Sequence, residues 1–175
     1  MSDRAFFDTN ILIYAISQNE RRAPRAEELL VVGGILSVQV LNEFVSMVRH
    51  KIRMPWKEVR EALEAFRILC PSPVAITLDT HEAALRIVEK YGFGIYDALI
   101  AAAALEAKCV TLYSEDLQDG RIINDQLTIR NPFKWFRLPS TRIGIRQLLR
   151  PASRLSYSAF TAAASSIRPS RLRER

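Results

Sequence analysis

Residues 5–13 read Ala-Phe-Phe-Asp-Thr-Asn-Ile-Leu-Ile, and this stretch decides how the rest of the chain is interpreted. An apolar run reaches the carboxylate of Asp8, two small polar residues follow, and the apolar character then resumes. The pattern predicts a buried strand that ends at Asp8 and turns into a helix over residues 10–17. Ligands of an open α/β sheet bind beyond the carboxyl ends of its strands. Asp8 is therefore interpreted in two ways, as part of a site at this edge or as the N-cap of the helix.

Short apolar runs and amphipathic segments continue to alternate up to about residue 130. Asp79 is expected to cap the helix that starts there. The periodicity predicts helices over residues 25–32, 39–51, 56–69, 79–91 and 94–107. It predicts strands over residues 35–38, 74–76 and 109–113, with a last strand or pair over residues 122–129. Such alternation is typical of an α/β fold with a mostly parallel central sheet that helices cover on both faces.

The composition is that of an ordinary globular protein. The length of 175 residues and the apolar fraction of 49% suit one domain with a proper core. No apolar run is long enough to span a bilayer, and the first residues do not resemble a signal peptide. Cys70 and Cys109 lie in apolar surroundings, which favours buried, reduced thiols over a metal or redox pair. His50 and His81 are isolated and lack the spacing of zinc ligands. We therefore expect a cytoplasmic protein with no membrane partner.

The charge is distributed unevenly between two parts of the chain. Residues 137–175 carry nine arginines and one glutamate, a charge of +8, and are rich in Ser and Ala. The formal charge of the whole chain is +6, so residues 1–136 carry −2. We expect a folded domain over residues 1–136 and a poorly ordered basic extension over residues 137–175. The extension is interpreted either as an arm for RNA or another polyanion, or as a disordered segment without a role of its own.

Three further acidic residues occupy places similar to that of Asp8. Glu43 comes in the first turns of a helix that directly follows a strand, Asp97 opens an alanine-rich apolar helix, and Asp116 follows a strand. Each also has a simpler interpretation. Glu43 suits a solvated surface position, Asp97 suits the positive end of a helix dipole, and Asp116 is one of three acids in five positions.

If these four carboxylates converge, they repel one another and their titrations are coupled. A divalent metal ion relieves such repulsion, and a set of oxygen ligands favours Mg²⁺ or Mn²⁺ over zinc. Such an ion can supply hydroxide, and a pair of such ions can stabilise the attacking and leaving oxygens of an in-line displacement at phosphorus. The reaction that suits this set of residues is phosphodiester hydrolysis. It needs no protein nucleophile, and the sequence contains no plausible Ser-His or Cys-His set.

The order and spacing of these motifs resemble a known family over residues 4–133. The motifs are Phe7-Asp8-Thr9-Asn10, Glu43 at a helix start, Tyr96-Asp97-Ala98, Ser114-Glu115-Asp116 and Asn131-Pro132-Phe133. Together they resemble the PIN domain, and more narrowly the VapC-type toxins of toxin–antitoxin pairs. The resemblance implies a three-layer sandwich and an endoribonuclease that depends on Mg²⁺ or Mn²⁺. It also implies an RNA substrate, a homodimer and a small cognate antitoxin that lies in a groove formed by the early helices.

The resemblance also implies roles for individual residues. Those that would bind the metal and carry catalysis are Asp8, Glu43, Asp97 and Asp116. Asn10 and Ser114 would orient these carboxylates, and Asp119 would assist or replace Asp116. The basic extension is not part of the family pattern.

Three other functions remain open. A HAD-type phosphatase also starts with a strand and an Asp, but it needs a second Asp where this chain has Asn10. A PIN-like scaffold would bind RNA or protein without cutting, and metal-dependent cleavage separates it from a nuclease. A housekeeping RNA-processing nuclease would share the site of a toxin.

Overall fold

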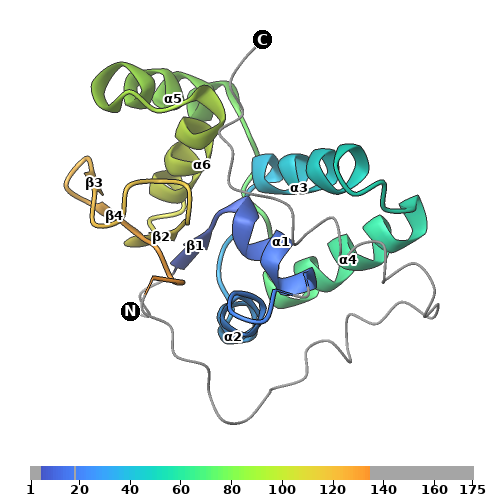
Figure 1. Ribbon diagram of the computed structural model, residues 1–175. Helices are drawn as coiled ribbons and strands as arrows, with labels where there is room; N and C mark the ends of the chain where they lie inside the picture. Colours follow the sequence, from blue (N-terminus) through green and yellow to red (C-terminus); the bar gives the residue numbers. More distant parts are fainter. Residues whose placement is uncertain (1–4, 18, 135–175) are drawn as a thin grey trace.

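The computed structural model describes residues 5–17 and 19–134, which form one α/β domain. Six helices and four strands follow one another in these ranges (Figure 1). In chain order they are β1 (Ala5–Phe7), α1 (Thr9–Ile16), α2 (Ala23–Val32), α3 (Val38–His50), α4 (Trp56–Leu69), α5 (Leu78–Tyr91), α6 (Ile95–Glu106), β2 (Thr111–Tyr113), β3 (Ile122–Ile123) and β4 (Leu127–Arg130). The five helices expected after residue 17 are therefore all present, and each begins and ends within a few residues of its predicted bounds.

The sheet has the strand order β1-β2-β4-β3. β1 pairs with β2 and β2 with β4 in parallel, while β3 and β4 form an antiparallel pair. The register places Phe7 opposite Tyr113, so β1 and β2 end side by side. This mostly parallel sheet confirms the predicted fold class, and the last predicted element is a pair of strands rather than one.

Two predicted strands are wrong in extent. Residues 35–38 and 74–76 do not form strands, and each makes only isolated parallel bridges: Phe6 pairs with Ile35, and Ser37 pairs with Val74. Backbone hydrogen bonds from Ile35 to Ala5 and from Phe7 to Ile35 still hold this segment along β1. The chain leaves the sheet direction at once to enter α3, so a longer ladder cannot form.

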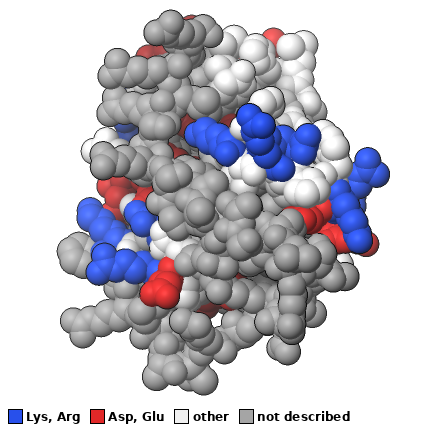
Figure 2. Space-filling model, turned by 45° about the vertical axis from the view of Figure 1, so that its right-hand side comes forward, with Lys and Arg blue, Asp and Glu red and all other residues white. Residues whose placement is uncertain are grey.

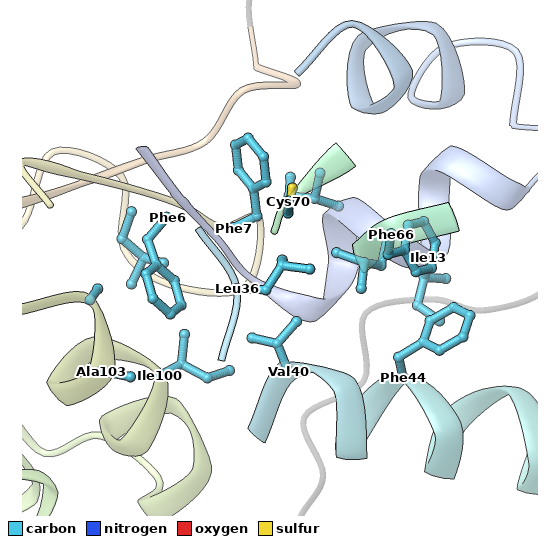
Figure 3. Packing of buried hydrophobic residues seen from close by; sticks show 14 of the residues in the cluster. Phe6, Phe7, Ile13, Leu36, Val40, Phe44, Phe66, Cys70, Ile100 and Ala103 are labelled. Carbon is cyan, nitrogen blue, oxygen red and sulfur yellow. The ribbon is translucent and has the colours of Figure 1, made fainter. Parts of the chain in front are cut away.

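Helices cover the sheet on both sides. Figure 1 shows α5 and α6 together on one side of β1, with α1 and α2 on the other. The α6 helix is apolar nearly all round, and the run from Ala98 to Ala104 is buried, because the helix is enclosed by its neighbours. Between α3 and α4, the rings of Phe44 and Phe66 meet edge to face with their centroids 5.2 Å apart (Figure 3). The apolar layers therefore fix how α3, α4 and α6 lie around the ends of the strands.

A glycine is required where the segment after α2 crosses β1. A Cβ atom added to Gly34 would lie 2.4 Å from Cε2 of Phe7 and 3.0 Å from the carbonyl oxygen of Ala5. Phe7 is fully packed, with 1% of its surface exposed, and cannot move aside. The close approach of these two backbones brings the start of α3 next to Asp8.

The predicted cap of α5 is also wrong by two residues. Thr77 is the N-cap, and its side chain and that of Thr80 satisfy each other's backbone N–H groups in a capping box. Asp79 instead lies in the first turn, where its charge suits the helix dipole. In the usual capping box, a Glu three residues after the Ser or Thr cap accepts the hydrogen bond from the N–H of the cap residue. Here Thr80 takes the place of that Glu.

Residues 137–175, for which a basic extension is expected, lie outside the described residues. Among the helices that the structure describes, none combines the length and the apolar character needed to cross a membrane. Cys70 and Cys109 are both buried, as predicted, and burial raises the pKa of the Cys70 thiol to about 11.

Candidate active site

Asp8 lies at the carboxyl end of β1 and is almost completely buried. Its Oδ1 accepts a hydrogen bond of 2.6 Å from the backbone N–H of Thr9, which makes Asp8 the N-cap of α1. Its Oδ2 accepts hydrogen bonds from the Ser114 hydroxyl at 2.6 Å and from the Asn10 amide at 2.9 Å. The capping interpretation is therefore confirmed, and it accounts for one of the two carboxylate oxygens. The other oxygen is held by the two residues that the sequence marked as orienting groups.

Glu43 lies in the second turn of α3 and is half-buried, so it is not the solvated surface residue of the simpler interpretation. Its Oε2 accepts a hydrogen bond of 2.9 Å from the Thr9 hydroxyl. Its Oε1 accepts one of 2.8 Å from the amide of Gln39, one helical turn earlier. Thr9 thus connects Glu43 to Asp8, since it also donates its backbone N–H to Asp8. Thr9 and Gln39 were not predicted from the sequence as groups of the site, although the spacing of Gln39 and Glu43 is that of neighbours on a helix.

Asp97 and Asp116 enter from two other elements. Asp97 lies in the first turn of α6, and Asp116 lies in the loop that follows β2. Burial, together with the charges of Glu43 and Asp116, raises the pKa of Asp97 to about 6. Burial also raises the pKa of Asp116, while a hydrogen bond from Asn10 and the charge of Lys51 lower it. Asn10 therefore bonds both Asp8 and Asp116.

The four predicted carboxylates act on one another electrostatically. The pKa of Asp8 is raised to about 8, and burial is the largest cause of the rise. The hydrogen bond from Ser114 opposes this rise, and the charges of Glu43, Asp116 and Asp97 add to it. The positive charge of Lys51 acts on this set through Asp116. The folded chain thus concentrates negative charge at the carboxyl ends of β1 and β2 and at the N-termini of α1 and α6.

The residues suit an oxygen-coordinated divalent ion. One buried acceptor, Oδ1 of Asn10, has no hydrogen-bond partner among the described residues, although it lies beside Asp8 and Asp116. No three acidic, cysteine or histidine side chains of the described ranges form a ready cage for a metal ion. Mg²⁺ usually takes only one or two protein carboxylates directly and keeps several of its waters. A loose group of carboxylates with a free amide oxygen is therefore compatible with Mg²⁺ or Mn²⁺, whereas it is not a zinc cage.

Asp119 has a different environment. Its Oδ1 accepts a hydrogen bond of 3.0 Å from the backbone N–H of Asn131, and its Oδ2 lies 3.4 Å from Nζ of Lys134. The bond from Asn131 and the charge of Lys134 lower its pKa, the reverse of the shift at Asp116. Asp119 thus ties the loop after β2 to the segment after β4.

A second polar cluster, which the sequence analysis missed, holds the loop that carries Ser114 and Asp116. Glu115 accepts hydrogen bonds from the Tyr14 hydroxyl and from the guanidinium of Arg22, whose Nε lies 2.8 Å from Oε1. The guanidinium lies over the Tyr14 ring, 5.2 Å from its centroid. The rings of Phe133 and Tyr14 also pack edge to face, with their centroids 5.1 Å apart. Glu115 therefore anchors the loop to α1 and to the start of α2, and its charge also raises the pKa of the neighbouring Asp116.

Comparison with known proteins agrees with this arrangement. A search of curated proteins found no match. The sequence profile of the PIN domain matches residues 5–119, which include all four carboxylates and every strand end that presents them. PIN domains are generally nucleases that use divalent metal ions. The chain belongs to the PIN domain family.

Proposed function

We propose that this PIN domain is an endoribonuclease that requires Mg²⁺ or Mn²⁺ and hydrolyses phosphodiester bonds of RNA. The observation that carries the proposal is the environment of Asp8, a buried carboxyl on which the charges of Glu43, Asp116 and Asp97 all act. A folded protein keeps such mutually repelling groups together at a cost in stability, so an opposing charge is expected to join them when the site works. A divalent cation and the phosphates that it brings with it meet that requirement.

The residues proposed to hold the metal are Asp8, Glu43, Asp97 and Asp116. A bound divalent ion would supply a water of lowered pKa and would stabilise negative charge on the phosphate under attack. Ser114 and Asn10 hold Oδ2 of Asp8 in place, and Thr9 and Gln39 hold the two oxygens of Glu43. These hydrogen bonds fix the carboxylates before substrate arrives, which is the role of groups around metal ligands.

The experiment is cleavage of a mixed tRNA and rRNA pool by the full chain, with Mg²⁺, with Mn²⁺ and with EDTA. The test variant is Asp97→Asn, in the first turn of α6, and the matched control is Asp79→Asn, in the first turn of α5. Both changes remove one charge from the start of a helix, so their effects on helix stability are similar. We expect cutting that requires metal, is lost in Asp97→Asn and is retained in Asp79→Asn.

Asp8→Ala is expected to abolish cleavage as well, with the fold intact by circular dichroism. Full activity in Asp97→Asn or Asp8→Ala, or cutting that persists in EDTA, would contradict the proposal. An absence of cutting with every RNA and both metals would favour the alternative of a PIN-like scaffold that binds RNA or protein.

We further propose that the nuclease is the toxin of a toxin–antitoxin pair, that it forms a homodimer and that it works in the cytoplasm. These proposals are supported by the resemblance of the five sequence motifs to VapC-type toxins. Expression of the chain should arrest growth, and co-expression of a small protein encoded by the adjacent gene should relieve the arrest. Normal growth under expression of an active enzyme would favour the alternative of a housekeeping RNA-processing nuclease. Light scattering of the purified chain tests the dimer.

A further inference from the structure

The turn between α3 and α4 has an unusual charge for this domain. No acidic residue occurs between Glu43 and Glu58, whereas Arg49, Lys51, Arg53 and Lys57 are all basic. Residues 1–136 as a whole carry a net charge of −2, so this local excess does not reflect the composition. We call residues 49–57 the basic turn. It lies at the right-hand edge of Figure 1, the side that comes forward in Figure 2, where Lys and Arg side chains gather in groups.

A favourable interaction with a helix dipole explains two of these four basic residues. Arg49 and Lys51 lie at the end of α3, where cations interact favourably with the helix dipole. Arg53 and Lys57 flank the start of α4, where the same dipole disfavours cations. Both side chains are exposed, and Nζ of Lys57 lies 4.0 Å from a carboxylate oxygen of Glu61, a weak surface pair. Their presence at a helix N-terminus is therefore better explained by an anion that the turn receives.

The basic turn also presents an aromatic ring to solvent. Trp56 is the first residue of α4 and is 53% exposed, although large aromatic side chains are usually well buried. The guanidinium of Arg49 lies over its ring, 4.7 Å from the centroid, and also donates a hydrogen bond to the carbonyl oxygen of Met54. Arg49 thus holds the indole in one orientation, and the exposed part of the indole remains available. Bases of single-stranded nucleic acid stack on such rings, with cations beside them for the phosphates.

The position of the turn relates it to the carboxylates. Lys51 follows Glu43 by eight residues along α3, a rise of about 12 Å. Lys51 and Asp116 are near enough for their charges to interact. A strand of RNA that reaches the carboxylates therefore has the basic turn within a few nucleotides of the bond to be cut.

We propose that the basic turn binds single-stranded RNA beside the acidic site, with a base stacked on Trp56 and phosphates held by Lys51, Arg53 and Lys57. The proposal extends the proposed function, because it identifies the substrate as an unpaired segment. A duplex offers no free base to the indole, so paired RNA binds here only through its phosphates.

The test uses Trp56 as its own reporter. The sequence contains two tryptophans, so the full chain with Trp135→Phe emits from Trp56 alone. A short fluorescein-labelled single-stranded RNA of mixed sequence is titrated in EDTA, and both Trp56 emission and RNA anisotropy are followed. We expect Trp56 to be quenched in step with the anisotropy, because stacking of a base quenches indole fluorescence.

Lys57→Gln should reduce the slope of log affinity against log salt by about 0.7. Arg67→Gln, a charge removed from the last turn of the same helix, should leave the slope unchanged. Trp56→Ala should weaken the component of binding that depends on the turn about ten-fold.

Binding of RNA to the basic extension would give a different result. RNA that binds elsewhere raises the anisotropy without quenching Trp56, and that outcome overturns the proposal. Equal salt slopes for Lys57→Gln and Arg67→Gln overturn it too. Quenching by a polyglutamate peptide but not by RNA would identify an acidic protein segment as the occupant instead. The binding experiment in EDTA does not depend on cleavage, so the two proposals can fail separately. Quenching of Trp56 by RNA, with no cleavage in Mg²⁺, would contradict only the proposed nuclease activity. Cleavage in Mg²⁺, with no quenching of Trp56, would contradict only RNA binding by the basic turn.

Discussion

The hydroxyl of Ser114 donates a hydrogen bond of 2.6 Å to Oδ2 of Asp8, joining two residues that lie 106 positions apart in the sequence. Both follow the last residues of paired parallel strands, since Phe7 lies opposite Tyr113. The bond links the loop after β2 to the carboxyl on which the charges of the other three acids act. It lowers the pKa of Asp8 against the effect of burial.

Ser114→Ala should therefore reduce cleavage and move its pH dependence. Without the hydroxyl, burial and the neighbouring charges raise the pKa of Asp8 further, so a higher pH is needed to ionise it. The low-pH limb of the cleavage rate should shift toward higher pH. Ser114→Thr keeps the hydroxyl and should restore the original profile. An unchanged limb in Ser114→Ala would show that this bond does not control Asp8.

The metal-free protein should become less stable as the pH rises. The pKa of Asp8 is about 8 in the folded chain against an ordinary value of 3.8, so the folded state binds this proton more tightly than the unfolded state. Between these two values the unfolded chain releases the proton first, and the free energy of unfolding falls with rising pH. Asp97, whose pKa is about 6, adds a smaller fall in the same direction up to that pH. Urea unfolding in EDTA from pH 4 to 9 measures this dependence.

Asp8→Asn removes the largest part of that dependence and serves as its control. The variant should be more stable than the native chain at pH 8 in EDTA, and the two should converge toward pH 4. Mn²⁺ should raise the melting temperature of the native chain more at pH 8 than at pH 5, because the ionised carboxylates are its ligands. A native chain that is most stable at pH 8 without metal would contradict this account of Asp8.

Glu115→Ala should destabilise the fold by about 1–3 kcal/mol, since Tyr14 and Arg22 lose a partly buried partner. Glu61→Ala, which breaks the exposed pair with Lys57, should cost less than about 1 kcal/mol. Chemical denaturation compares the two variants. Equal losses would mean that the cluster around Glu115 is no stronger than a surface ion pair. The Glu115 variant should also lower the rate of cleavage at saturating RNA, because its loop carries Ser114 and Asp116.

Gly34→Ala should lower the free energy of unfolding by about 1–3 kcal/mol or more, because the added methyl group would overlap the buried Phe7 ring. Gly92→Ala separates this clash from backbone strain. Gly92 has a φ of +71° with open space around it, so its variant should lose only about 1–2 kcal/mol through the left-handed conformation. Thermal unfolding of both variants provides the comparison. A Gly34→Ala protein as stable as the native one would show that β1 and the segment after α2 can separate.

A chain truncated after Leu138 should fold, since we propose that the domain ends near residue 136. Phe133 packs on Tyr14 within the cluster around Glu115, so a chain truncated after Asn131 should be less stable. Circular dichroism and thermal unfolding of the two truncations measure this difference. An unfolded protein after truncation at Leu138 would show that the basic extension belongs to the fold.

The four acidic positions could be predicted from sequence because local patterns carry them. A strand that ends in Asp, or a helix that starts with Asp, is visible within a few residues, and parallel strands bring such ends to one edge. The sequence could not separate Glu115 from Asp116, because both follow the same strand. The hydrogen bonds of Glu115 with Tyr14 and Arg22 distinguish it from Asp116, and residues 93 or more positions apart leave no local pattern.

The errors in secondary structure have a similar cause. Residues 35–38 have the apolar, branched composition of a strand, but their pairing is limited by the immediate entry into α3. The cap of α5 was placed on Asp79 because Asp is a common cap. The capping box of Thr77 and Thr80 satisfies the same N–H groups two residues earlier. Lys51 could not be related to the carboxylates from periodicity, since its contact depends on how α3 lies across the sheet.

The central claim is that the four carboxylates form a divalent metal site. Titration calorimetry of Mn²⁺ into the full chain at pH 8 without RNA tests it most directly, with Asp97→Asn and Asp79→Asn beside the native chain. The account predicts saturable binding that is lost or strongly weakened in Asp97→Asn and unchanged in Asp79→Asn. Binding that is equal in all three proteins, or that is absent from the native chain, would contradict it.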